Sequence, residues 1–129
     1  MSFDVVLADL KRLYQICSDQ RPFFTSQLTE VDIQRWSTCM GISRAALYDQ
    51  IAIHLARGFH NSDMTFTFCD AIVTDIHQVI IDANEERPGL FWRVYLAFDE
   101  GEYYHNNDRD EDPEEVYARP QIAQIIESH

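Results

Sequence analysis

The chain has 129 residues and a formal net charge of −12 at pH 7, from 22 acidic and 10 basic side chains. Nucleic acids and anionic membrane surfaces are bound through clustered Lys and Arg, so this balance opposes both kinds of partner unless a local basic face overrides it. The length fits a single domain spanning residues 1–129, and 46% apolar residues suffice for a core without a disulfide, a metal or a cofactor.

Two features of the sequence favour a cytoplasmic protein without a membrane anchor. No apolar run approaches the roughly 18 residues of a bilayer span, and the start MSFDVVLADLK lacks the basic residues and cleavage site of a signal peptide. Cys17, Cys39 and Cys69 are far apart in apolar surroundings, which predicts reduced, buried thiols rather than a disulfide framework or a zinc site.

Helical spacing of apolar residues begins near the N-terminus. Residues 2–17 place apolar side chains three and four positions apart, which predicts a first helix. Thr29 followed by Asp32 is typical of a capping box and predicts the start of a second helix, which Gly41 would end.

Two further helices follow from similar start and stop signals. Ser43 is a typical N-cap for a third helix, which we expect to end at Gly58. Ser62 or Asp63 would open a fourth helix with apolar residues through Ile80.

The stretch LFWRVYLAF, residues 90–98, allows two interpretations. Its apolar positions fit a helix that Pro88 would introduce, but its aromatic and β-branched content would also suit a strand paired with residues 64–68. We favour the helix. With short helices expected after Pro113 and from Pro120, the prediction is an all-α bundle of five or six helices, and an α+β fold with a strand pair at 64–68 and 90–98 is the alternative.

The segment AFDEGEYYHNNDRDEDPEE, residues 97–115, concentrates nine carboxylates against one guanidinium beside two adjacent tyrosines. Carboxylates attract a cationic partner over long range, and tyrosines are typical short-range anchors of protein interfaces. We therefore predict a partner-binding surface for a basic protein. Its residues would be Glu102, Tyr103, Tyr104, Asp108, Asp110, Glu111 and Asp112.

This segment resembles the bacterial immunity proteins that neutralise nuclease toxins such as colicins. The resemblance lies in the paired tyrosines, the acidic loop after them and Pro113 leading into a helix, within residues 97–115. It implies inhibition by occlusion, without chemistry, and a nuclease-type toxin as the class of basic partner.

A second local resemblance concerns IQRWSTCMGISRAALYDQIA, residues 33–52, which is similar to the helix-turn-helix of phage repressors and resolvase-type domains. The turn at Gly41 and the opening GISRAALY carry the likeness, which implies DNA contacts by Arg44 and Tyr48. Residues 29–60 hold three acidic residues and three arginines, so a basic footprint is missing. A structural helical corner is favoured, and a DNA-binding regulator is the alternative.

The enzyme alternative depends on Asp70 and His77, which are seven residues apart and share a helix face. With His54 they could form an acid–base or ligand set if all three converged in one pocket. Asp108, Asp110 and Asp112 alternate as in a calcium loop, but Pro113 and Arg119 occupy the positions of its glycine and glutamate. We expect a binding protein rather than an enzyme, with no metal site and no cofactor.

Overall fold

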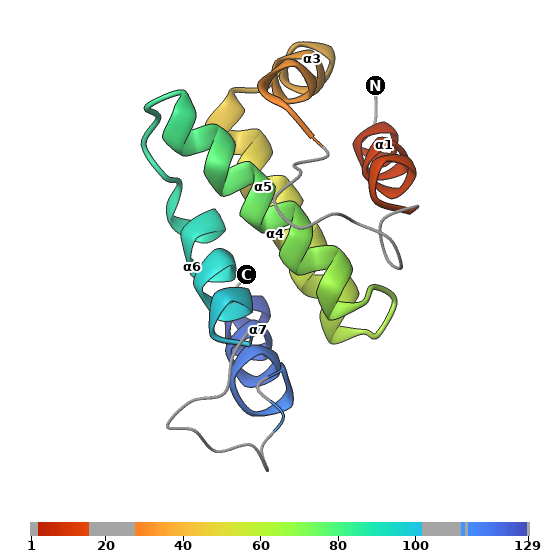
Figure 1. Cartoon of the computed structure of the whole chain (residues 1–129), viewed down its shortest axis with the longest axis vertical. Helices are drawn as coiled ribbons and strands as arrows, with labels where there is room; N and C mark the ends of the chain where they lie inside the picture. Colours follow the sequence, from red (N-terminus) through yellow and green to blue (C-terminus); the bar gives the residue numbers. More distant parts are fainter. Residues whose placement is uncertain (1–2, 16–27, 102–111, 113, 129) are drawn as a thin grey trace.

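The computed structural model describes residues 3–15, 28–101, 112 and 114–128 (Figure 1). Within these residues the chain forms six α-helices and one π-helical turn, and no strand. The elements are α1 (Asp4–Gln15), α3 (Glu30–Met40), α4 (Arg44–His60), α5 (Phe66–Asp82), α6 (Gly89–Glu100), the π-helical turn η2 (Glu114–Ala118) and α7 (Arg119–Glu127). The predicted all-α fold is therefore confirmed.

The alternative α+β fold is wrong. Residues 64–68 form the connection into α5 and its first turn, and residues 90–98 lie inside α6. In α6 the side chains of Phe91, Val94 and Phe98 are fully buried, at the three- and four-residue spacing of one helix face. Because this face packs against both α4 and α5, helical burial outweighs the strand preference of its aromatic residues.

The predicted helix boundaries at α3 and at the start of α4 are confirmed. The backbone N–H of Thr29 donates to the Asp32 carboxylate over 3.0 Å, as in a capping box. Gly41 has a φ of 68° and ends α3, because a residue without Cβ tolerates this left-handed conformation. The Ser43 hydroxyl accepts from the N–H of Ala46 over 3.1 Å and caps α4.

The boundary between α4 and α5 was predicted wrongly. α4 continues past Gly58, and α5 is capped by Thr65 rather than by Ser62 or Asp63. Gly58 serves packing instead of termination: a Cβ atom there would lie 2.5 Å from the sulfur of Met64. The glycine lets the connection fold back over the end of α4.

The bundle is built around α4 and α5. α6 packs against both of them, and α7 with the π-helical turn packs against α6 (Figure 1). α7 also contacts α4, and α3 contacts α4. Among the described residues, the largest fully buried side chains are Trp36, Tyr48, Phe59, Phe91 and Phe98.

Polar contacts attach α1 to its neighbours. Asp9 accepts from the indole of Trp36 over 2.8 Å and pairs with Arg35 over 3.3 Å, which links α1 to α3. The Trp36 hydrogen bond is the main reason why the pKa of Asp9 is lowered. The hydroxyl of Tyr14 donates to the buried carboxylate of Asp75 over 2.6 Å and links α1 to α5.

The cysteines only partly match the sequence prediction. Cys69 is buried, and burial raises the pKa of its thiol to about 12. Cys39 lies exposed near the end of α3, so the prediction of a buried thiol was wrong there. Cys17 lies outside the described residues.

In the part of the chain that the structure describes, no helix has both the length and the apolar character needed to cross a membrane.

Candidate functional site

Most of the predicted partner-binding surface lies outside the described residues, so its membership stays a prediction. Asp112 is described and is exposed. The remaining members, which lie outside the described residues, are Glu102, Tyr103, Tyr104, Asp108, Asp110 and Glu111. The structure does describe the two places where this acidic segment, residues 102–112, joins the body.

The elements on either side of the acidic segment meet in a packed contact. Gly101, the residue before it, is buried, and a Cβ atom there would lie 2.8 Å from the Phe66 ring and 2.9 Å from the Cβ of Ala118. Ala118 is itself fully buried at the end of the π-helical turn. Since α6 packs against both this turn and α7, the helices on either side of the segment hold each other in place (Figure 1).

The first described cation after the acidic segment is already bound within the protein. Arg119 pairs with Glu115 over 3.2 Å, donates to the carbonyl of Phe59 over 3.2 Å and lies 4.3 Å above the Phe59 ring. The carboxylate of Glu100, at the end of α6, accepts a hydrogen bond from Gln121. Arg119 therefore does little to offset the other carboxylates of this end of the bundle.

Four of the seven described arginines, Arg119 included, are paired with acidic neighbours. Among the described residues, Lys11, Arg57, Arg87 and Arg93 have no ion pair, and they belong to four different elements or connections. The ion pairs are Arg12–Asp9, Arg35–Asp9, Arg35–Asp32, Arg44–Glu30, Arg44–Glu85 and Arg119–Glu115. Four of the eight described cations are thus bound to carboxylates of the protein itself.

The two candidate DNA-contacting residues lie at the corner between α3 and α4 and are engaged inside the protein. Arg44 pairs with Glu30 over 3.0 Å and with Glu85 over 2.9 Å. Its guanidinium also donates to the hydroxyl of Tyr48 over 3.2 Å. The Tyr48 ring is buried and its hydroxyl donates to Glu85 over 2.7 Å. These contacts favour the structural role of the corner.

The residues of the enzyme alternative have different neighbours. His54 on α4 stacks on Phe3 with ring centroids 4.3 Å apart. His77 on α5 stacks at the same distance on Tyr95 of α6. No group of three His, Cys, Asp or Glu side chains among the described residues could hold a metal ion. Among the described residues, the two histidines therefore stack on different rings, His54 on Phe3 and His77 on Tyr95.

The sequence did not reveal a cluster of rings on α5 and α6. Trp92 and Tyr95 stack with centroids 5.3 Å apart, and His77 lies against both rings. The Arg87 guanidinium lies 4.0 Å above Trp92. Burial, together with Arg87, lowers the pKa of His77. A helical projection could have placed Trp92 and Tyr95 together, but His77 joins them only through the packing of α5 on α6.

The sequence also gave no sign of a hollow between α1 and the start of α5. It has a volume of about 410 Å³ and is lined by Lys11, Asp63, Met64, Thr65 and Phe68. These residues form no local motif, because Lys11 is more than 50 positions away from the others.

Comparison of the chain with models of protein families, with curated proteins and with solved structures gave no match.

Proposed function

We propose that the protein binds a basic protein partner through residues 102–112 and inhibits it by covering its cationic surface. The observation that carries this proposal is that four of the seven described arginines are paired with acidic neighbours. The chain has 10 basic residues against 22 acidic ones, and Arg12, Arg35, Arg44 and Arg119 are bound to other carboxylates, so fewer cations remain for the carboxylates of the acidic segment.

The expected consequence is a long-range electrostatic attraction between the acidic segment and a cationic partner. A concentrated negative charge accelerates the encounter with a positively charged surface, and it repels nucleic acid. The active clefts of nucleases are cationic because their substrates are polyanions, which makes this class of enzyme a suitable partner. The resemblance to immunity proteins supports occlusion as the mode of inhibition.

The contact of Gly101 with Phe66 and Ala118 supports the same proposal. Gly101 follows α6 and Ala118 ends the π-helical turn, so this contact joins the elements on either side of the acidic segment. Joining both ends of a segment to a rigid body lowers the entropy that its binding to a partner would cost. Tyr103 and Tyr104, which follow Gly101 after one intervening residue, would supply the short-range anchors.

The test compares two triple charge reversals. In one, Asp108, Asp110 and Asp112 are changed to lysine. In the matched control, three exposed carboxylates with no described ion pair, Asp82, Glu86 and Glu127, are changed to lysine. Basic proteins are captured from a cell extract with the unaltered protein, purified, and measured by biolayer interferometry at about 50 mM and about 500 mM NaCl.

We expect the reversal in the acidic segment to slow association about tenfold or more at low salt and to remove most of its salt dependence. The control reversal has the same change in net charge and should have a much smaller effect. Tyr103→Ala or Tyr104→Ala should speed dissociation about 30-fold, corresponding to about 2 kcal/mol for an interface hot spot. Equal association rates for the two triple variants would refute the proposed site.

Inhibition is measured with the same purified partner. Its enzymatic activity should fall in proportion to the fraction bound, and the segment variant should restore it. A complex in which the partner keeps its full activity would refute inhibition while leaving the binding site intact.

A further inference from the structure

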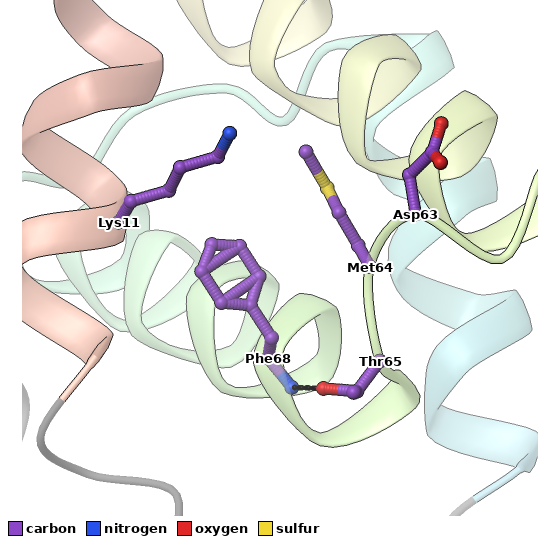
Figure 2. A pocket seen from close by; sticks show the side chains of 5 residues that line it. All are labelled: Lys11, Asp63, Met64, Thr65 and Phe68. Carbon is purple, nitrogen blue, oxygen red and sulfur yellow. Dashed lines mark hydrogen bonds between the residues drawn. The ribbon is translucent and has the colours of Figure 1, made fainter.

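The hollow between α1 and the start of α5 has the dimensions of a small-molecule site. Its volume of about 410 Å³ lies within the range of about 300–1,000 Å³ that is typical of ligand pockets. Figure 2 shows that α1 supplies Lys11 and that the connection into α5 and its first turn supply the remaining lining residues.

The apolar wall of the hollow is held in place from behind. The ring of Phe68 packs edge-on against Tyr14, with centroids 6.2 Å apart, and its backbone N–H is bound to the Thr65 hydroxyl over 3.1 Å. Met64 lies directly on the backbone of Gly58. An apolar group entering the hollow would therefore meet surfaces that already have support.

Lys11 supplies a cation beside the apolar side chains of the hollow. Figure 2 shows the side chain of Lys11 reaching over the Phe68 ring towards the methyl end of Met64. Lys11 is the sole lysine of the sequence, and it has no ion pair among the described residues. Its side chain is exposed, so its ammonium is accessible to an anionic group of a ligand, with the modest attraction of an exposed ion pair.

The acidic residue of the hollow is separated from this cation. Asp63 lies on the other side of Met64 in Figure 2, and it forms no ion pair with Lys11. A ligand anion would be attracted at the Lys11 end and repelled at the Asp63 end. The hollow therefore has a positive charge at its Lys11 end and a negative charge at its Asp63 end.

We propose that this hollow binds a small carboxylate with a compact aromatic or aliphatic body. The carboxylate pairs with the ammonium of Lys11, and the apolar body lies on Phe68 and Met64. This inference does not rest on the proposed inhibitor function, since none of the described residues that line the hollow belongs to the acidic segment.

The test uses 2-naphthoate as the probe and 2-naphthamide as a neutral ligand of the same shape. Binding is followed by NMR on protein with ¹³C-labelled methionine methyl groups, where Met64 reports on the hollow and Met40 serves as an internal reference. Lys11→Gln removes the ammonium at an exposed position, and Arg93→Gln makes the same change in net charge at an exposed arginine of α6. Urea unfolding of each variant checks that it is folded.

We expect naphthoate to shift the Met64 methyl signal and to bind at least about threefold more tightly than the amide. Lys11→Gln should abolish this preference, and Arg93→Gln should keep it. Absence of a Met64 shift at about 5 mM naphthoate would overturn the proposal. So would equal affinity for the acid and the amide, or a preference for the acid that Lys11→Gln leaves unchanged.

Discussion

Arg44 joins three parts of the bundle, and its replacement by alanine tests whether the corner between α3 and α4 is structural. The guanidinium binds Glu30 of α3, Glu85 in the connection after α5, and the hydroxyl of Tyr48 one turn along its own helix. The Arg44 side chain is 20% exposed, so these bonds are partly shielded from water. Bonds to Tyr48 and Glu30 outweigh the effect of burial and raise the pKa of Arg44.

The expected change in the free energy of unfolding can be estimated from the interactions that each partner of Arg44 would lose. Glu30 is 59% exposed, and such a pair contributes about 0.2–1 kcal/mol. Glu85 is 24% exposed and would keep one donor, the Tyr48 hydroxyl, so losing the second costs about 1 kcal/mol. Alanine in the first turn of a helix offsets about 0.5 kcal/mol, through higher propensity and removal of a cation from the positive end of the helix dipole. We therefore expect Arg44→Ala to lower the free energy of unfolding by about 1 kcal/mol, and the lost packing of the arginine stem raises this towards about 2 kcal/mol.

The assay is urea unfolding followed by tryptophan fluorescence, with an unchanged m-value as the sign that stability alone has changed. Arg57→Ala is the matched control, because Arg57 lies on the same helix, is exposed and has no described ion pair. Its effect should stay within about 0.5 kcal/mol. Equal stabilities for the Arg44 and Arg57 variants would refute the reasoning. The DNA-binding alternative expects the opposite for Arg44→Ala: wild-type stability and loss of duplex retardation in a gel.

Two further predictions concern the packing of α6. Burial lowers the pKa of His77 below its usual 6.5, so the unfolded chain binds this proton more readily and the free energy of unfolding should fall as the pH drops below about 6.5. Urea midpoints at about pH 7.5 and pH 5.5 should show this decline, and His77→Phe should make it smaller; an identical decline in the variant would contradict the assignment. Gly101→Ala should cost about 1–3 kcal/mol, because its Cβ would collide with Phe66 and Ala118. Gly89→Ala is its control, because a Cβ there meets nothing within 4 Å. Thermal unfolding should show almost no loss of stability for this variant. Equal losses of stability at both glycines would refute the close packing of Gly101 against Phe66 and Ala118.

The local signals of the sequence were sufficient for the fold class. Thr29 with Asp32, Gly41 and Ser43 act on backbone groups within about four residues of themselves, so their meaning does not depend on the remainder of the chain. The same signals failed at Gly58, because the role of that glycine is set by Met64, which packs on it from the next connection. A sequence shows that a glycine is present, but it does not show whether a turn or a neighbour requires it.

The chain's surplus of carboxylates was also determined by the sequence, since net charge is a sum over residues. Which cations remain available was decided by the tertiary structure. Arg44 meets Glu85 across 41 positions, and Lys11 reaches the hollow beside Phe68, which is farther away still along the chain. Such contacts between residues distant in sequence follow from how α1, α4 and α5 pack together. That packing minimises the exposed apolar area of the whole chain, so no short window of residues contains the information that sets it.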